Sequence, residues 1–370
     1  MLRLAFRNLF QNKVRLVISV GGVALALSLI LSLDAIMAGV ERQVSAYIDH
    51  SRADIWVAQE KVRNMHMAYS ALPASTVSHV KNVAGVESAT PILYLTTLIE
   101  VGKDRSAAYV IGLPNNPEAG EAWNVPVGKI IPGSGEIILD RSVATRAGLK
   151  LGDKVKVLGE EFTIAGLSEG TAAISGSVAF VSKKDWYLLQ TNADAVSFVL
   201  ATVKAGESPD AVAARIEAQA SKVTAQTRQS FAAQERQVVR DMSTDLIAIM
   251  NLVGFLIGLA VMALTVYTAT LARRAEYGVL KALGARNADL YRAVLGQAFV
   301  SVAFGFMLGL AFTFILSALV PRLNVPIAMD ISGESLAKVG SVSLIIASLS
   351  AILPIKQIAG LDPAIVFRGK

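Results

Sequence analysis

Residues 246–272 read LIAIMNLVGFLIGLAVMALTVYTATLA, a segment without one charged side chain. Three more segments, 16–33, 293–320 and 339–355, are also free of charge. A bilayer core about 30 Å thick needs about 20 predominantly apolar residues in one helix. The last segment is short and contains serines, which a span packed against other helices tolerates. The sequence therefore predicts four transmembrane helices, with a buried core helix as the alternative for the last segment.

The composition agrees with a membrane protein. Of the 370 residues, 53% are apolar and 17% are charged, against about 25% charged residues in an ordinary soluble protein. The chain has no cysteine, which excludes a thiol nucleophile, a disulfide framework, a cysteine zinc site and an iron–sulfur cluster. The net charge of +6 is compatible with nucleic acid or with an anionic membrane, and its distribution decides between them.

The basic residues predict the orientation in the membrane. Residues 1–15 carry four basic side chains and no acidic one, and 273–292 and 356–370 are also net basic. The segment 321–338 is balanced. Because positive charge accumulates on the cytoplasmic side, both termini are expected in the cytoplasm and 39–245 outside it. The positive charge is thus explained by the orientation of the chain in the membrane and by contact with membrane lipid. No nucleic-acid partner is expected.

The N-terminal segment allows two interpretations. Basic residues before an apolar stretch that ends near Ala35 and Ala38 also occur in a cleaved signal peptide. The apolar core of a signal peptide is usually only about 7–15 residues long, which is shorter than this one. Apolar residues alternate with basic residues at helical spacing over 1–15. This pattern favours an amphipathic helix on the inner membrane surface.

The segment 39–245 is predicted to be a mixed α/β domain outside the membrane. Short apolar runs bounded by turn residues predict strands at 53–58, 109–112, 136–139, 154–158, 162–165 and 198–201. A helix is expected from residue 73 to Gly85, and another with Ser208 as N-cap and Pro209 in its first turn. The polar, proline-free flanks at 34–50 and 230–245 are interpreted as stalk helices that extend the first two spans, with linker loops as the alternative.

The sequence contains no recognisable catalytic motif. It lacks a phosphate-binding loop, a nucleophile elbow and a His-Glu-x-x-His zinc motif. Met65, His66 and Met67 are soft metal ligands, but consecutive residues do not share a helix face, so a surface loop is preferred and no metal site is expected. Asp34 is expected at the water-exposed outer end of the first span, and no charged group lies mid-span. This argues against a proton- or sodium-driven transporter.

The segment 273–286, RRAEYGVLKALGAR, has a helical period. Its apolar and charged positions fall on different sides: Val279, Leu280 and Leu283 against Glu276 and Lys281. Gly284 is expected to end this helix, and Asn287 to cap the next one. A short mixed-charge helix between two spans is suited to dock on a partner. A plain loop on the lipid surface is the alternative.

Residues 276–285, EYGVLKALGA, closely resemble the signature of the MacB/FtsX-like family of ABC transporter permeases. That signature is an acidic residue followed by Gly-Val/Ile-Leu-Lys/Arg-Ala-Leu/Ile-Gly-Ala between the second and third spans. Four more segments agree with the family: 4–15, 135–139, 148–155 and 354–368. The resemblance covers essentially the whole chain, and its length resembles that of the smaller, four-span members without a fused ATPase.

The resemblance implies the following order along the chain. A cytoplasmic amphipathic helix (1–15) precedes the first span (16–38), which leads into an extracytoplasmic MacB-like core domain (39–245). Then come the second span (246–272), a coupling-helix loop (273–292), the third span (293–320), a short outer loop (321–338), the fourth span (339–355) and a cytoplasmic tail (356–370). It also implies a location in the cytoplasmic membrane of a bacterium.

The function implied is that of a permease subunit, not an enzyme, in an ATP-driven exporter of an amphiphilic or hydrophobic substrate. A separate ABC ATP-binding subunit would bind ATP and Mg²⁺, so that no cofactor is expected in this chain. A second permease copy or a close paralogue would complete a dimer, and tripartite members add a membrane-fusion protein. The alternative is an FtsX-like mechanotransmitter that regulates an extracytoplasmic partner without transport.

The resemblance also assigns residues. Coupling to the ATPase is expected of Arg274, Glu276, Tyr277, Gly278, Leu280, Lys281, Leu283 and Gly284. Small residues four apart let membrane helices approach closely. Gly254 and Gly258 in the second span are therefore expected to pack against a second protomer, and Gly305 and Gly309 in the third span match the pattern less specifically.

Overall fold

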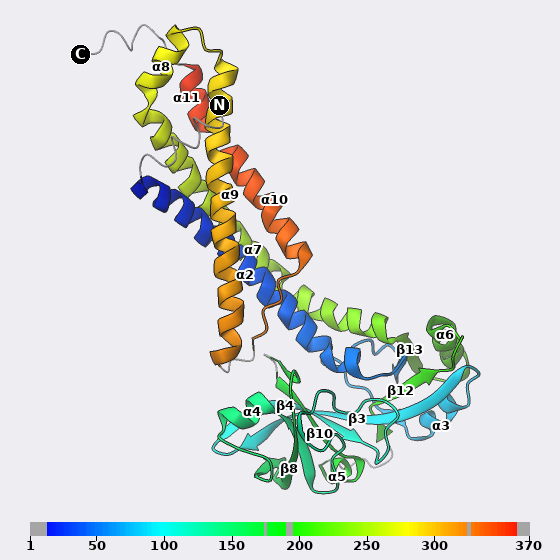
Figure 1. Ribbon diagram of the computed structural model, residues 1–370. Helices are drawn as coiled ribbons and strands as arrows, with labels where there is room; N and C mark the ends of the chain where they lie inside the picture. The colour runs from blue at the N-terminus through cyan, green and yellow to red at the C-terminus, as the bar shows by residue number, and fades with distance from the viewer. Residues whose placement is uncertain (1–12, 174–175, 190–194, 324–326, 361–370) are drawn as a thin grey trace. The chain divides into compact units, whose positions relative to one another are not determined.

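The computed structural model describes residues 13–173, 176–189, 195–323 and 327–360. The described residues within 1–38, 243–322 and 329–370 form a helical unit, and those within 39–242 and 323–328 form a sheet unit (Figure 1). The amphipathic helix expected at 1–15 and the tail expected at 356–370 lie largely outside the described residues.

Among the described residues, four helical segments are long and apolar enough to cross a membrane. They are α2 (Lys13–His50), α7 (Arg228–Ala272), α9 (Asn287–Leu319) and the pair α10 (Gly333–Ser350) and α11 (Ile352–Ala359). The prediction of four transmembrane helices is confirmed, and each helix is longer than its uncharged segment. The last one begins at Gly333, well before residue 339, because the Ser332 side chain accepts a hydrogen bond from the backbone N–H of Ser335 and caps it.

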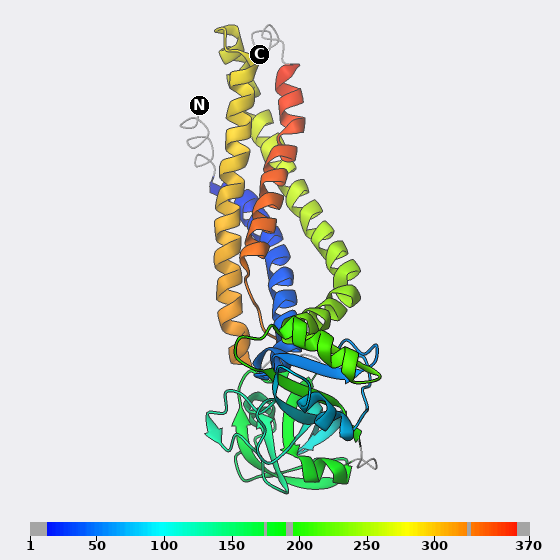
Figure 2. The same ribbon diagram turned by 90° about the vertical axis from the view of Figure 1, so that its right-hand side faces the viewer.

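Two prolines explain where the last helices end or break. Pro321 lies in a short 3-10 turn, η1 (Val320–Leu323), that ends α9. Pro354 lacks an N–H, and in a continuous helix its ring would collide with the carbonyl of Ser350. The helix is accordingly interrupted at Ala351, between α10 and α11. Figures 1 and 2 show α9 and α10 side by side.

Glycines let the helices of the helical unit pack closely. A Cβ on Gly254 of α7 would lie 2.8 Å from Cγ1 of Ile30 in α2, and one on Gly258 would lie 3.1 Å from Ile346 in α10. Both glycines are buried within this chain. Both glycines therefore pack helices of this chain together, as their spacing indicates, and contact with a second protomer stays a prediction.

The sheet unit is built around a mixed sheet whose strands follow the order β13-β1-β12-β3-β4-β10-β6-β8-β5. Most pairs are antiparallel, but β10 is parallel to β4, and β6 is parallel to β8. The bounds are β1 (Ile55–Gln59), β3 (Val86–Val101), β4 (Asp104–Leu113), β5 (Val127–Gly128), β6 (Glu136–Asp140), β7 (Lys154–Val157), β8 (Glu160–Ser168), β9 (Ala172–Ala173), β10 (Gly176–Ser182), β12 (Phe198–Val203) and β13 (Val223–Thr227). A separate pair joins β2 (Leu72–Pro73) to β11 (Ala195–Val196).

Alternate residues of each strand face two different cores. On β1, Ile55 and Val57 join a core that includes Val143 and Val212, whereas Trp56 joins an aromatic core. The first core is covered by α3 (Ser75–Lys81), α4 (Arg141–Arg146), α5 (Lys183–Leu189) and α6 (Pro209–Gln219). The aromatic core receives Tyr47 from the end of α2 and Phe231 from the start of α7, and Phe231 stacks on Trp56 at 5.0 Å. The predicted mixed α/β domain is confirmed.

All six predicted strands overlap observed ones, but three details differ. The helix expected to stop at Gly85 ends at Lys81, and Gly85 adopts a positive φ in the turn that follows. Helix α6 begins at Pro209 as expected, although the Ser208 side chain makes no capping hydrogen bond. Asn287 is the first residue of α9, whose N-cap is Arg286.

Candidate functional site

The loop between the second and third spans contains one short helix, α8 (Arg274–Ala282). Gly284 ends it with φ of +91°, a conformation that glycine adopts without strain. The N–H of Gly284 donates to the carbonyl of Lys281 at 3.1 Å, and that of Ala285 donates to Leu280 at 3.0 Å. This is the bonding of a Schellman ending, so the expected helix stop is correct.

One face of α8 is packed against the helical unit. Tyr277 is 5% exposed and belongs to the same core as Leu290 of α9 and Ile358 of α11, while Leu280 packs at its edge. Burial raises the pKa of the Tyr277 phenol. The ammonium of Lys281 donates to the carbonyl of Ala359 at 3.1 Å, at the C-terminal end of α11, where a positive charge is favourable. These contacts fix the orientation of α8.

The opposite face of α8 is exposed and mostly apolar. Leu283 is 80% exposed and Val279 is 42% exposed. Ala275, Glu276 and Ala282 are exposed beside them, and this spacing puts all five on one helix face. We call Ala275, Glu276, Val279, Ala282 and Leu283 the α8 ridge.

The structure divides the predicted coupling residues between the two faces. Arg274, Glu276, Leu283 and Gly284 are exposed, whereas Tyr277, Gly278, Leu280 and Lys281 face the helical unit or contact it. The expectation that Leu280 shares a side with Val279 and Leu283 is wrong, because Leu280 packs against the core. Val279 also lies on the exposed face although it is not among the predicted coupling residues, and its position one turn before Leu283 is the signal for it.

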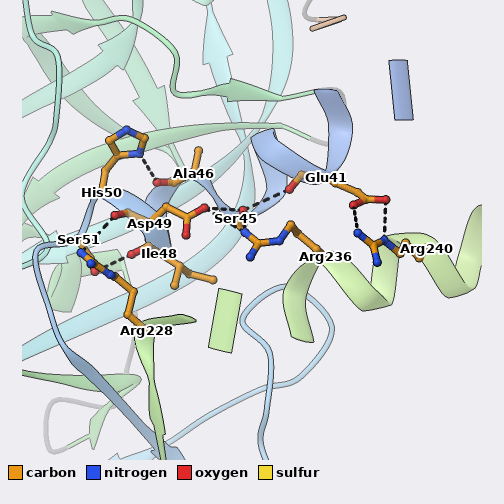
Figure 3. A network of polar contacts seen from close by, with 10 residues as sticks. All are labelled: Glu41, Ser45, Ala46, Ile48, Asp49, His50, Ser51, Arg228, Arg236 and Arg240. Atoms are coloured by element: carbon orange, nitrogen blue, oxygen red, sulfur yellow. Dashed lines mark hydrogen bonds and ion pairs between the residues drawn. The ribbon is translucent and has the colours of Figure 1, made fainter. Parts of the chain in front are cut away.

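A second polar site joins the sheet-unit ends of α2 and α7 (Figure 3). Arg240 donates to both carboxylate oxygens of Glu41, at 2.9 and 2.7 Å. Arg236 donates to Oγ of Ser45 at 2.8 Å and to Oδ2 of Asp49 at 3.2 Å. Residues 41, 45 and 49 are spaced by four, as are 236 and 240, so each set forms a stripe along its helix. We call these five residues the α2–α7 stripe.

Asp34 occupies a buried polar cluster in the helical unit. Its Oδ1 accepts hydrogen bonds from the ammonium of Lys338 at 2.9 Å and from the amide of Asn251 at 3.2 Å. Asp34 is only 8% exposed. The expectation that water reaches Asp34 is wrong, because the side chain is buried and its Oδ1 contacts Lys338 and Asn251.

The His66 segment is attached to α7. His66 Nδ1 lies 2.8 Å from Oε1 of Glu235, whose Oε2 accepts the N–H of Met65 at 2.6 Å. Glu235 is 1% exposed, Met65 is 2% exposed and Met67 is 64% exposed. Met67 thus lies on a surface, but His66 is held by a buried carboxylate. No group of three or more His, Cys, Asp or Glu side chains in the described part of the chain is placed to hold a metal ion.

Two family models match the sequence. That of the MacB-like periplasmic core domain matches residues 16–219, more than half of the chain, and that of the FtsX-like permease C-terminal region matches 248–363. The chain is also similar to an uncharacterized ABC transporter permease of Methanocaldococcus jannaschii. The two are 21% identical over 409 residues, which cover 99% of this chain and 97% of the relative.

Two solved structures resemble part of the fold. The periplasmic region of MacB from Actinobacillus actinomycetemcomitans covers 50% of this chain and 92% of its own, with 11% identity and a TM-score of 0.39. The extracellular domain of the noncanonic ABC-type transporter YknZ from Gram-positive bacteria covers 47% of this chain and 100% of its own, with 10% identity and a TM-score of 0.37.

Proposed function

Since the chain belongs to the MacB/FtsX-like family of ABC transporter permeases, we propose that it is the permease subunit of an ATP-driven exporter whose ATP-binding subunit docks on the α8 ridge. A permease of this family is a multi-pass membrane protein that works with an ATP-binding subunit and is a non-catalytic transport subunit itself. In this proposal the partner binds ATP and Mg²⁺.

The observation that carries the proposal is the exposed apolar ridge of a helix whose other face is fixed. Burial of a leucine such as Leu283 contributes about 1.5–3 kcal/mol, and Glu276 adds a carboxylate that a basic groove would complement. Because Tyr277 and Lys281 attach α8 to α9 and α11, movement of a docked partner would move those helices too. Helix α8 would therefore be the element through which a docked partner moves the helical unit.

The α2–α7 stripe supports transmission of that movement. Helix α7 runs without interruption from Arg228 to Ala272, immediately before α8 in the chain. At its other end, two arginine contacts tie it to α2 within the sheet unit. We propose that these two helices act as the stalk of the outer domain and carry work done at α8 into the sheet unit, as mechanotransmission requires.

The remaining assignments complete the proposal. The sheet unit lies outside the cytoplasmic membrane, whereas α8 and both termini lie inside. A second copy or close paralogue forms the dimer, and a membrane-fusion protein joins if the system is tripartite. An amphiphilic or hydrophobic substrate leaves the membrane as the ATP-binding subunits close.

The test uses the full chain purified with its ATP-binding subunit, which is sought first among the neighbouring genes. Leu283→Glu places a charge at the most exposed apolar side chain of the α8 ridge, so the subunits are expected to separate and ATP hydrolysis to lose its dependence on the permease. Leu188→Glu is the matched control, because Leu188 is 69% exposed in α5 of the sheet unit. A Leu283→Glu complex that assembles and hydrolyses ATP like the wild type contradicts docking on α8.

A second measurement separates export from control of an outside partner. Export predicts that ATP hydrolysis by the reconstituted complex changes when amphiphiles are added. A different result is that amphiphiles do not change the rate of ATP hydrolysis and that the complex binds an extracytoplasmic enzyme. This result would contradict export but would leave the proposed docking on α8 supported. The chain would then be an FtsX-like mechanotransmitter.

A further inference from the structure

A pocket of about 280 Å³ opens in the sheet unit between the β3–β4 hairpin and the end of α4. A Cβ on Gly102, in the hairpin turn, would lie 3.6 Å from the carbonyl oxygen of Ala147, just after α4. The apolar part of the lining includes Val101 and Val143, which are 1% and 3% exposed. None of the pocket residues belongs to the α8 ridge or the α2–α7 stripe.

Two opposite charges line this pocket without neutralising each other. Asp104 and Arg146 are both exposed, and neither forms an ion pair or a side-chain hydrogen bond with any described residue. Their neighbours behave differently, since Arg105 pairs with Glu100 at 3.3 Å and Arg141 pairs with Glu169. Two charged groups at the pocket are thus unpaired among the described residues: the Asp104 carboxylate and the Arg146 guanidinium.

A buried hydroxyl group adds a third polar feature. Ser177 lines the pocket and is 2% exposed, and its Oγ has no hydrogen-bond partner among the described residues. An unsatisfied buried hydroxyl costs about 1–3 kcal/mol. Because Ser177 lines the pocket, an anion bound beside this hydroxyl would give it a partner and remove that cost.

We propose that this pocket binds a small zwitterion. Its anionic group lies on the Arg146 guanidinium and the Ser177 hydroxyl, its ammonium lies on Asp104, and its short apolar part rests on Val101 and Val143. A ligand with only a negative charge would face the Asp104 carboxylate, and one with only a positive charge would face Arg146. A free amino acid and the phosphoethanolamine headgroup of a lipid share this chemistry.

The proposal does not rest on docking at α8, so it is tested on the full chain without an ATP-binding subunit. Isothermal titration calorimetry in detergent compares L-valine and phosphoethanolamine with 3-methylbutanoate and 2-methylpropylamine, which are valine without its ammonium and without its carboxylate. At least one zwitterion is expected to bind at least about tenfold more tightly than both single-charge analogues, as expected when one charge-assisted contact is lost. The zwitterion that binds identifies the source as a free amino acid or a headgroup.

Variants assign the binding to this pocket. Arg146→Ala and Asp104→Asn are each expected to weaken binding of that zwitterion by at least about tenfold. Arg141→Ala is the matched control on the same helix, because Arg141 pairs with Glu169 and does not line the pocket. Both tested side chains are exposed, so the melting temperature should stay unchanged and shows that the variants are folded.

Three results would overturn the proposal. In the first, neither valine nor phosphoethanolamine binds. In the second, 3-methylbutanoate or 2-methylpropylamine binds as tightly as the zwitterion. In the third, folded Arg146→Ala and Asp104→Asn proteins bind the zwitterion as the wild type does.

Discussion

Leu158 shows how a single residue can hold a conformation that it does not favour. It lies with Gly159 in the two-residue turn between β7 and β8, and both have positive φ, +50° and +92°. A leucine in the left-handed region costs roughly 1–2 kcal/mol, and asparagine is better tolerated there. The Leu158 side chain is 55% exposed, so little packing offsets this cost.

Leu158→Asn is therefore expected to raise the free energy of unfolding by about 1 kcal/mol. Thermal unfolding of the purified chain, followed by circular dichroism, measures the change. Leu188→Asn is the control, since Leu188 is also well exposed but lies in helix α5. An unchanged or lower melting temperature for Leu158→Asn would contradict this account of backbone strain at Leu158.

Lys338 is expected to be a stabilising residue because of the carboxylate that it contacts. Lys338→Met removes the ammonium 2.9 Å from Asp34 and leaves a carboxylate that is 8% exposed without a cation. Breaking a fully buried pair costs about 3–5 kcal/mol, and the 49% exposure of Lys338 puts the expected loss below that range, at about 1–3 kcal/mol. The double variant Asp34→Asn/Lys338→Met should recover most of the lost thermal stability. A double variant as unstable as Lys338→Met alone would contradict this account.

At the scale of elements, the α2–α7 stripe is where two helices are joined by charge. Arg240→Glu places a carboxylate opposite Glu41, and like charges at this distance repel. We expect the complex with the ATP-binding subunit to keep basal ATP hydrolysis but to lose its response to amphiphiles. The charge swap Glu41→Arg/Arg240→Glu restores attraction and should restore the response. Full response in Arg240→Glu alone would show that the stripe does not transmit movement.

The elements differ in how far the sequence predicts them. Helix α8 and its end at Gly284 are predictable because periodicity and a left-handed glycine are local properties. The orientation of Lys281 is not, since it depends on α11, a distant segment. The stripe was missed because Glu41 and Arg240 are 199 positions apart. Strand β3 was missed because Pro91 and polar residues interrupt its apolar alternation, and because its partner β12 is remote in sequence.

At the scale of the whole molecule, hydropathy predicts the number of spans because lipid demands long uninterrupted apolar helices. It does not predict where each helix ends. The helix ends depend on Pro354, on the cap at Ser332 and on polar extensions of the helices. None of these features raises the local hydropathy, so a hydropathy profile does not show them. The zwitterion pocket was equally hidden from the sequence, because hairpin and helix residues meet there only in the fold.

The sheet unit is expected to fold alone. Residues 39–242 contain both stripe partners and both cores of the sheet. We expect this fragment to express as a soluble monomer with cooperative unfolding, and Arg240→Ala to lower its stability by about 0.5–1 kcal/mol. Circular dichroism and size-exclusion chromatography check both statements. A fragment that aggregates or unfolds without cooperativity would contradict them.

The two ends of the sheet unit meet in neighbouring strands. Strand β1 follows α2, strand β13 precedes α7, and they pair with Ile55 opposite Thr227. A segment that leaves a helix and returns beside its own starting point can be exchanged as a cassette. Gene fusion or recombination could replace it with another domain whose ends are equally close, while the helical unit and α8 keep their sequence. The helical unit could in this way acquire a different attached domain through the exchange of a single insert.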